Sequence, residues 1–334
     1  MSRIIAGVDI GGTKCAVCIA SVSDLSPGAW QAPAILGKER FPTPETPELA
    51  IESILAALEQ LLRSLADPQT PGYPLLTAVG VSCGGPLDSR NGLILSPPNL
   101  PGWDRVDVLT PIAERFGVPA GLQNDANACA LAEWRWGAGR CCRNMIFLTF
   151  GTGMGAGLIL DGRLYSGTND MAGEVGHVRL EKFGPVGYGK AGSFEGFCSG
   201  GGIAHLARIM ATERLQRGQS SLFCRAMEDL PAITAEMVAL AAREGDSLAL
   251  EVFHVVGEKL GEGLSLLVDI LNPERIVIGS IFARQRALME PLALARLHEE
   301  ALGLSLGVCQ IVPAELGESV GDLAGLSVAL EKLL

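Results

Sequence analysis

Two short segments of this chain share one pattern, in which an apolar run leads into a glycine-rich turn and a second apolar run follows. The first segment is Ile4–Ala20, with its turn at Asp9–Thr13. The second is Met145–Leu160, with its turn at Gly151–Gly155. Each pattern predicts two strands joined by a tight turn. Because one copy lies in each half of the chain, the sequence indicates a duplicated α/β architecture.

Strands and helices are expected to alternate along the rest of the chain. Periodicity and breaker residues predict helices at 46–65, 104–116, 126–136, 246–271 and 322–334, and strands at 78–81, 119–123 and 275–278. This alternation predicts an α/β fold with a largely parallel sheet. The length of 334 residues exceeds what a single hydrophobic core usually supports, so two domains are expected.

Composition excludes several classes of partner. The chain has 26 basic and 37 acidic residues, a net charge of −11, which disfavours nucleic acid and anionic membrane surfaces. Its longest charge-free stretches, Pro68–Leu87 and Asn144–Leu160, are interrupted by prolines or glycines, so no membrane span is expected. The N-terminus lacks a signal-peptide pattern, and the nine cysteines lack the spacing of a disulfide framework. We therefore expect a cytoplasmic protein with reduced thiols.

The turn at Asp9–Lys14 has the residue types of a phosphate site. Glycines let the backbone approach an anion closely, and their N–H groups can point at phosphate oxygens. Thr13 adds a hydroxyl donor, and Asp9 can orient Mg²⁺ directly or through water. A tight hairpin that needs glycine only for its backbone conformation explains the same residues, and the turn alone does not separate the two interpretations.

Two other glycine clusters resemble nucleotide motifs less closely. Gly151–Gly157 loosely fits a dinucleotide fingerprint, but Ala156–Leu160 predicts a strand where that fingerprint requires a helix. A hairpin that holds phosphate is the better interpretation. Gly184–Ala191 nearly matches a P-loop, but Ala191 stands where a hydroxyl must bind Mg²⁺, so we treat the match as chance.

Asp125 is the candidate acid of the chain. It follows a predicted strand and opens a predicted helix, where a carboxylate can act as general base on a substrate hydroxyl. For an Asp in this position taken alone, capping of the helix is the stronger interpretation, since Asp and Asn are preferred N-caps.

Six motifs together resemble one family. The chain is similar to the ROK family of sugar kinases and repressors, within the actin-like and hexokinase superfamily, and the resemblance extends from Ile4 to Gly325. The motifs that carry it are, in chain order, Asp9-Ile-Gly-Gly-Thr-Lys, Gly84-Gly85-Pro86-Leu87-Asp88, Pro98-Asn99-Leu100-Pro101-Gly102-Trp103, Asn124-Asp125-Ala126-Asn127, Gly151-Thr152-Gly153-Met154-Gly155 and Glu174-Val175-Gly176-His177.

The resemblance implies a two-lobed actin-like ATPase fold of the ribonuclease H-like type, with a ligand cleft between the lobes. The expected N-terminal lobe is 1–122, to which the C-terminal helix 321–334 returns, and the expected second lobe is 123–320. Homodimers are common in the family, so a homodimer is expected.

The resemblance also implies a set of site residues. Asp125 matches the catalytic base that accepts the proton of the attacking hydroxyl, usually O6. The positions that match the sugar site are Gly85, Asn99, Asn124, Asp125, Glu174, His177 and Glu195. Those that match the ATP site are Asp9, which would support Mg²⁺, together with Gly11, Gly12, Thr13, Lys14, Gly151, Thr152, Gly153, Gly155, Gly279 and Ser280. Many relatives have glycine where Ser280 stands.

The chain departs from the family in the segment after His177. Many relatives carry three cysteines there that bind structural zinc together with the histidine, and this chain has Val186, Tyr188 and Ser193 at those positions. Structural zinc needs about four ligands, so we expect none to bind. Our hypothesis is that Tyr188 and Phe194 replace the metal by apolar packing. For His177 a buried structural role stays open beside the sugar contact.

The resemblance implies an ATP-dependent hexose kinase of the glucokinase type that uses Mg²⁺. Glucose is the leading substrate, while N-acetylglucosamine, N-acetylmannosamine, mannose, fructose and allose stay open. A repressor would need a helix-turn-helix domain before the strand at Ile4, where we see no room for one. The remaining alternative is a sugar-binding protein of the same family without catalysis.

Overall fold

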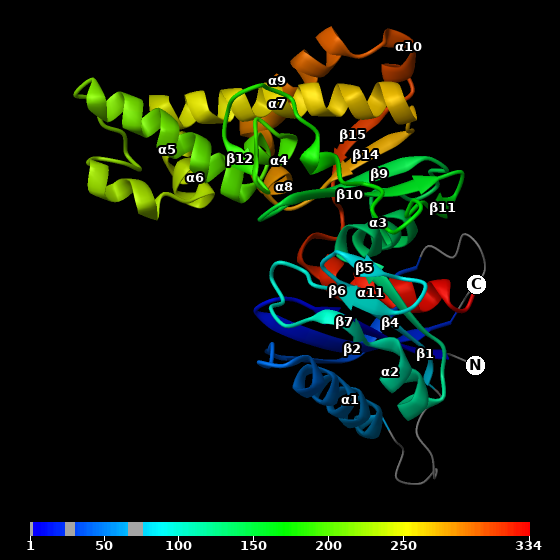
Figure 1. The fold of residues 1–334 in the computed structure, drawn as a ribbon. Coiled ribbons are helices and arrows are strands. Elements are labelled where there is room, and N and C mark those ends of the chain that lie inside the picture. Colours follow the sequence, from blue (N-terminus) through cyan, green and yellow to red (C-terminus); the bar gives the residue numbers. More distant parts are fainter. Residues whose placement is uncertain (1–2, 24–30, 66–75) are drawn as a thin grey trace. The chain divides into compact units, whose positions relative to one another are not determined.

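The computed structural model describes residues 3–23, 31–65 and 76–334 (Figure 1). Residues 68–75 of the stretch Pro68–Leu87 lie outside the described residues. The chain forms two compact units. The first comprises Met1–Arg143, Gly157–Ala172 and Glu315–Leu334, and the second comprises Asn144–Ala156 and Gly173–Ala314.

The first unit extends past the boundary expected after residue 122, and the reason lies in helix α3 (Asp125–Trp136). Glu133 of α3 is fully buried, and its carboxylate accepts backbone N–H groups from Ala138, Glu315 and Leu316. These bonds satisfy a charge that would be costly to bury alone. They tie α3 to the returning C-terminal segment, so α3 belongs to the first unit.

A five-stranded sheet forms the centre of the first unit, with the order β3-β2-β1-β4-β8. Strand β1 pairs antiparallel with β2 and parallel with β4, and β4 pairs parallel with β8. The carboxyl ends of β1, β4 and β8 therefore lie at one edge of the sheet. The strands are β1 (Arg3–Ile10), β2 (Lys14–Val22), β3 (Ala34–Pro42), β4 (Leu76–Cys83) and β8 (Ala120–Asn124).

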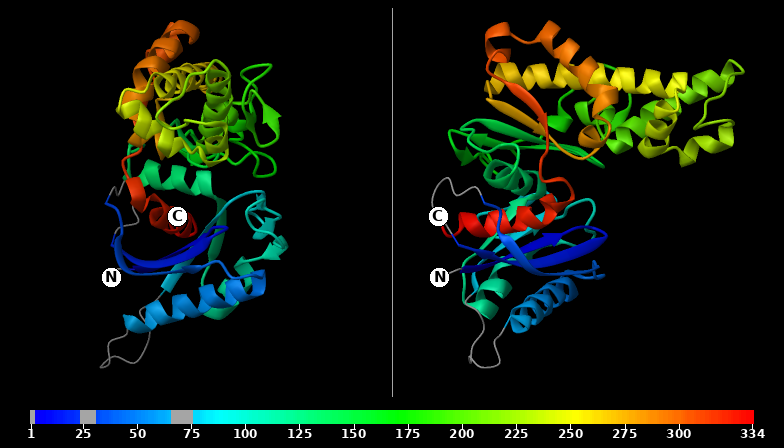
Figure 2. Two further views of the ribbon diagram at one scale, coloured as in Figure 1. Left: turned by 90° about the vertical axis from the view of Figure 1, so that its left-hand side faces the viewer. Right: turned by 180° about the vertical axis from the view of Figure 1, so that it is seen from behind.

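Helices cover both faces of this sheet (Figures 1 and 2). Alternate side chains of β1, among them Ile4 and Val8, join the core cluster that includes helix α1 (Pro47–Ser64) and Ile112 of helix α2 (Leu109–Phe116). Ile5 points to the opposite face and joins the cluster of α3 and α11 (Val320–Glu331). The period of two along β1 thus builds two separate cores.

Helix α11 approaches the sheet closely because three glycines face one another. A Cβ atom on Gly80 of β4 would lie 2.1 Å from the carbonyl oxygen of Gly325, and one on Gly7 of β1 would lie 2.8 Å from the backbone nitrogen of Leu326. Both distances are too short for a real side chain. Small residues at these positions therefore set how near α11 lies to β1 and β4.

The second sheet repeats the strand order of the first. It runs β11-β10-β9-β14-β15, so in both sheets the third, second, first, fourth and fifth strands are neighbours in that order. Strand β14 pairs parallel with β9 and with β15. The duplicated architecture predicted from the two glycine-turn segments is confirmed. The strands are β9 (Met145–Phe150), β10 (Met154–Leu160), β11 (Arg163–Leu164), β14 (Arg275–Ile278) and β15 (Gln310–Pro313).

Most predicted elements agree with the structure, and one differs. Residues Asp104–Asp107 were expected to begin a helix, but they form β7, which pairs with β6 (Leu93–Leu95), and β6 also pairs with β5 (Leu87–Asp88). Asp107 then accepts the backbone N–H groups of Leu109 and Thr110 at the start of α2.

The second unit contains most of the remaining helices, and α7 packs along α9. The elements of that unit not yet named are η1 (Val175–His177), β12 (Val186–Gly187), β13 (Lys190–Ala191), α4 (Phe194–Phe197), α5 (Gly200–Gln216), η2 (Met227–Ala232), α6 (Ala235–Arg243), α7 (Ser247–Leu271), α8 (Ile281–Arg284), α9 (Arg286–Glu300) and α10 (Gly303–Leu306). The short η3 (Gly317–Ser319) precedes α11. None of the helices in the described ranges combines the length and apolarity needed to cross a bilayer.

Gly80→Ala tests the close approach of α11. The added methyl group would overlap the backbone of α11, and we expect a loss of about 1–3 kcal/mol in the free energy of unfolding, measured with urea. Gly303→Ala is the control, because a Cβ atom there meets nothing within 4 Å. Equal stability of the two variants would contradict this account of the packing.

Candidate functional site

Asp9 and Asp125 lie where two strands of the first sheet end. Asp9 is the penultimate residue of β1, and Asp125 directly follows β8. Asp9 is half-buried. Burial, followed by the negative charges of Asp125 and Asp322, raises the pKa of Asp9 from 3.8 to about 6. The carboxyl groups are thus near enough to repel one another, which a cation between them would relieve.

Asn124, and not Asp125, is the N-cap of α3. The Asn124 side chain accepts the N–H of Ala126 at 2.9 Å, and Oδ1 of Asp125 accepts the same N–H at 2.8 Å. Backbone N–H groups of Ala126 and of Asp125 itself bond this carboxylate. The Asp125 side chain is reachable from solvent, while the surrounding protein raises its pKa by desolvation. Capping therefore does not account for Asp125.

Glycines bring the other polar residues of the first unit next to these acids. A Cβ atom on Gly12 would lie 2.2 Å from the carbonyl oxygen of Asn99, and one on Gly85 would lie 3.0 Å from Nδ2 of Asn124. A Cβ atom on Gly84 would lie 3.5 Å from Oδ1 of the Asn99 side chain. The structure therefore brings together Asn99, Asn124 and the Asp9–Lys14 turn, which are far apart in the sequence.

The turn after Asp9 has fewer available amide donors than the sequence suggested. The Gly11 N–H donates to the carbonyl oxygen of Lys14 at 3.1 Å, so the turn itself uses it. The residues Gly12, Thr13 and Lys14 are exposed. These three residues are the ones in the turn that a phosphate can reach.

Asp322 belongs to this acidic group although our sequence prediction did not include it among the site residues. Its carboxylate pairs with Lys38, and Arg40 lies 4.0 Å away. A Cβ atom on the preceding Gly321 would lie 3.8 Å from Oδ2 of Asp9. Asp322 lies in the last stretch covered by the resemblance, Gly321–Gly325, but an acid in the first turn of a helix is common, so the sequence did not mark it as a site residue.

In the second unit the turn between β9 and β10 is held by its own backbone. Gly151 N–H donates to the carbonyl oxygen of Gly153 at 3.1 Å, and Gly155 N–H donates to the Thr149 hydroxyl at 2.9 Å. Thr152 at the tip is exposed. The predicted hairpin is confirmed, and the strand β10 that follows excludes a dinucleotide fingerprint.

Glu174, His177 and Glu195 gather beside this hairpin. Glu174 is the N-cap of the short helix η1 and His177 is its last residue. Both side chains are exposed, so the buried structural role for His177 is wrong. Glu195 lies in the first turn of α4, and its Oε2 accepts the Met154 N–H at 3.0 Å. All three predicted sugar-site residues of this unit therefore lie near the glycine hairpin.

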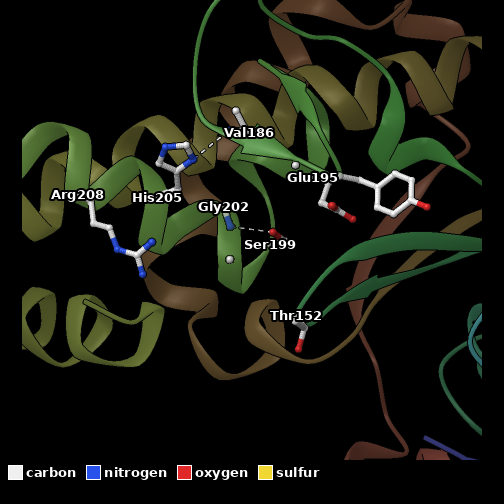
Figure 3. A pocket seen from close by; sticks show the side chains of 10 residues that line it. Thr152, Val186, Glu195, Ser199, Gly202, His205 and Arg208 are labelled. Atoms are coloured by element: carbon white, nitrogen blue, oxygen red, sulfur yellow. Dashed lines mark hydrogen bonds between the residues drawn. The ribbon is translucent and has the colours of Figure 1, made fainter. Parts of the chain in front are cut away.

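A cavity of about 390 Å³ opens between the hairpin and α5 (Figure 3). Thr152 and Glu195 line it together with His205 and Arg208, which the sequence analysis did not select. The Nδ1 atom of His205 accepts the Val186 N–H at 3.1 Å, and Arg208 donates to the carbonyl oxygens of Leu230 and Ile233. No motif in the sequence marked these two residues.

Gly279 and Ser280 directly follow β14 and lie close to the hairpin. A Cβ atom on Gly151 would lie 3.8 Å from the Ser280 hydroxyl oxygen. Ser280 has a φ of 52°, a conformation that favours glycine, which fits the glycine of many relatives. Directly after it, Ile281, Arg284 and Gln285 line a second cavity of about 560 Å³ with residues of α6.

The segment whose cysteines bind zinc in many relatives has no cysteine at those positions here. Val186 and Tyr188 are exposed, and the buried Ser193 hydroxyl caps α4 by accepting the Gly196 N–H. Within the described ranges, no three His, Cys, Asp or Glu side chains are grouped so that they could hold a metal. The residues present therefore do not fit a zinc ion.

Packing of this segment agrees with our hypothesis for Phe194 but not for Tyr188. Phe194 is buried against α7, where a Cβ atom on Gly263 would lie 2.2 Å from its ring. Tyr188 is 73% exposed, so it adds little apolar packing. Lys259 of α7 instead anchors the segment, with Nζ 2.6 Å from Glu181 and 5.8 Å from the Phe197 ring centre.

Comparison with known proteins identifies the family. The ROK family model matches residues 5–331. The chain belongs to the ROK family.

Relatives in this family include both kinases and repressors. The glucokinase of Streptomyces coelicolor is 29% identical over 97% of each chain. A xylose repressor of Caldicellulosiruptor bescii is 32% identical over 66% of this chain and 56% of its own length.

Solved structures show the actin-like ATPase fold. The ROK hexokinase of Thermus thermophilus is 27% identical with a TM-score of 0.76, covering 98% of this chain and 99% of its own. The Streptomyces griseus glucokinase, solved with glucose and AMPPNP, is 26% identical with a TM-score of 0.71 and the same coverage.

Asp9→Asn tests the electrostatic cost of the acidic group. Because the pKa of Asp9 is about 6 in the folded chain and 3.8 when unperturbed, the unfolded chain releases its proton first as the pH rises. Asp9 therefore costs stability above pH 6 and none below pH 3.8. We expect the variant to be more stable at pH 7.5 by about 1–3 kcal/mol in EDTA-containing buffer, a gain that shrinks between pH 6 and pH 4. A gain independent of pH would contradict the assignment.

Lys259→Met tests the anchor of the zinc-less segment. Burial alone would lower the pKa of Lys259, but hydrogen bonds to Glu181 and Glu262 outweigh it and raise the pKa, so the group is a cation. Removing it leaves the carboxylate of Glu262 without this partner, and we expect a loss of about 1–3 kcal/mol in the free energy of unfolding.

The exposed Lys182→Met serves as its control and should change stability by less than about 0.5 kcal/mol. Chelators should leave the melting temperature of the wild-type protein unchanged. One zinc per chain by metal analysis, or a melting temperature that falls in EDTA, would reject this account.

Proposed function

We propose that this protein is an ATP-dependent hexose kinase that phosphorylates a sugar hydroxyl, O6 of glucose or of a related hexose or N-acetylhexosamine. The observation that carries the proposal is Asp125, a solvent-reachable acid whose pKa is raised by desolvation and whose helix is capped by its neighbour Asn124. The glucokinase relatives support the same reaction.

Asp125 serves as the general base. Its Oδ1 is held by the Ala126 N–H, which fixes the carboxylate and leaves Oδ2 to accept the proton of the attacking hydroxyl. Desolvation raises the pKa of Asp125, and a raised pKa makes this carboxylate a stronger base than an ordinary aspartate. The side chains of Asn99 and Asn124 orient the sugar beside it.

The two glycine turns bind the phosphates of ATP. In one turn Gly12, Thr13 and Lys14 are exposed, and in the other Thr152 is exposed at the tip. Phosphoryl transfer depends mainly on alignment and on neutralising charge. Lys14 contributes a positive charge to the turn.

The surroundings of Asp9 suit a residue that supports a magnesium ion. Like charges from Asp125 and Asp322 surround it, and Mg²⁺ is often held by one or two carboxylates together with substrate phosphates. When bound, Mg²⁺ neutralises charge on the phosphates. Asp9 is the residue that would hold it, directly or through water.

The cavity after Ser280 suits the base of the nucleotide. Half of its lining is apolar, from Ala235, Ala239, Leu240 and Ile281, and half is polar, from Glu236, Arg243, Arg284 and Gln285. Sites for a planar ring combine apolar surface with polar groups that fix its orientation. In the same unit Glu174, His177 and Glu195 complete the set of residues assigned to the sugar.

A second candidate is a sugar-binding protein without catalysis. The loss of the zinc-binding residues and the similarity to a xylose repressor favour it. Homodimer formation and the absence of nucleic-acid binding stay predictions under either function.

Asp125→Asn tests the proposed function. ADP release is measured by a coupled assay across a panel of hexoses and N-acetylhexosamines with Mg²⁺ and ATP. We expect kcat for the best sugar to fall about 10²–10⁴-fold in the variant while sugar affinity changes little, because only the proton acceptor is lost.

Asp161→Asn is its matched control, since Asp161 is an exposed acid paired with Arg143, and it should keep wild-type activity. Equal ADP release by Asp125→Asn would reject the base. Sugar binding without turnover for every sugar would favour the second candidate.

A further inference from the structure

Glu195 contacts the glycine hairpin more closely than a role in sugar binding alone would require. Its Oε2 accepts the Met154 N–H at 3.0 Å. A Cβ atom on Gly153 would lie 2.9 Å from the same oxygen, so the carboxylate occupies space that the hairpin glycine leaves open. The hydrogen bond and the missing side chain together fix Glu195 against the turn that carries Thr152 at its tip.

The same carboxylate residue also touches the segment that carries Glu174 and His177. A Cβ atom on Gly176 would lie 3.1 Å from Cβ of Glu195 and 2.2 Å from the carbonyl oxygen of Met154. Gly176 is therefore packed between Glu195 and the first residue of β10. Three segments that are separate in the sequence meet at Glu195 without intervening side chains.

One oxygen of Glu195 stays available for a ligand. Oε2 is engaged by the hairpin, while no donor within the described part of the chain is bonded to Oε1. Both Glu195 and Thr152 line the cavity of about 390 Å³ (Figure 3). A polar ligand that donates to Oε1 would restrict the carboxylate, and through Oε2 it would restrict the backbone of the hairpin.

We propose that Glu195 couples sugar binding to nucleotide binding through its hydrogen bond to the Met154 N–H. The inference rests on the proposed kinase function, in which Glu195 faces the sugar and the hairpin faces the phosphates. A sugar hydroxyl on Oε1 orders the hairpin, so the nucleotide that follows loses less conformational freedom on binding. Coupling of this kind is reciprocal, and the nucleotide tightens sugar binding by the same factor. Glu195 is in this respect a positioning residue for the hairpin.

Calorimetric titration of the full chain measures the coupling. AMPPNP with Mg²⁺ is titrated with and without saturating glucose, or the panel sugar with the highest turnover. We expect the Kd of AMPPNP for the wild-type protein to fall about 5–20-fold when sugar is present, within the usual range of coupling between sites. A Kd that does not change would overturn the inference.

Two substitutions of Glu195 separate coupling from simple contact. Glu195→Ala removes both oxygens, and its coupling factor should fall close to one. Glu195→Gln keeps an oxygen that can accept the Met154 N–H, so it should weaken sugar binding and yet retain most of the coupling factor. If Glu195 served folding alone, Glu195→Ala and Glu195→Gln would not differ in their coupling factors. A coupling factor in Glu195→Ala equal to that of the wild type would refute the proposal.

Two glycines of the hairpin supply a matched pair of variants in which residue 195 itself is not substituted. Gly153→Ala adds a methyl group against Oε2, whereas a Cβ atom on Gly151 finds only the Ser280 hydroxyl at 3.8 Å. We expect Gly153→Ala to weaken glucose binding at least fivefold more than Gly151→Ala does. Equal effects of the two on glucose binding would argue against the path through Oε2. Every readout here is a binding constant and does not depend on turnover. If the coupling is intact but no ADP is released, the kinase reaction is rejected and the coupling proposal stands.

Discussion

Backbone segments that touch without room for a Cβ atom determine where several candidate groups of this protein lie. Helix α11 meets β1 and β4 through Gly7, Gly80 and Gly325, and this contact sets how near α11 lies to the strand that carries Asp9. Gly12 brings Asn99 to the turn after Asp9, and Gly153 brings Glu195 to the second hairpin. In each case a side chain would push apart the segments whose polar groups must act together. The glycines therefore act mainly through tertiary packing, and their conformational freedom matters less.

Electrostatics oppose this arrangement in the first unit. Asp9, Asp125 and Asp322 are close enough to raise the pKa of Asp9, which costs stability at neutral pH. The ion pairs of Asp322 with Lys38 and Arg40 offset part of that repulsion. A protein selected for stability alone would not keep three acids together, so the cluster is better explained by a bound cation and phosphates. Perturbed groups of this kind concentrate at functional sites.

The fold and the order of the site motifs could be predicted from sequence because local patterns carry them. Apolar runs and glycine turns predicted both hairpins, and Asn124-Asp125 was placed correctly between a strand and a helix. Asp104–Asp107 was mistaken for helix because its pairing partner β6 is not visible in a local pattern. Asp322, His205 and Arg208 were not selected, since their importance comes from neighbours distant in the chain. Tyr188 was assigned to packing from its apolar ring, but only the structure shows that the β12–β13 hairpin leaves the ring in solvent.

The segment that lacks the three cysteines of many relatives keeps Glu195 in position through contacts that need no metal. A metal bound by thiolates holds a loop by covalent-like bonds, whereas here the buried Ser193 caps α4, Phe194 packs on Gly263, and Lys259 binds Glu181. Two of these contacts lie within three residues of Glu195 along the chain, and the hydrogen bond to Met154 adds a third restraint on the side chain itself. Apolar burial and a half-buried ion pair depend on solvent more than a metal centre does. Placement of Glu195 in this protein therefore depends on the hairpin that it touches, and for that reason a change in the hairpin reaches the residue assigned to the sugar.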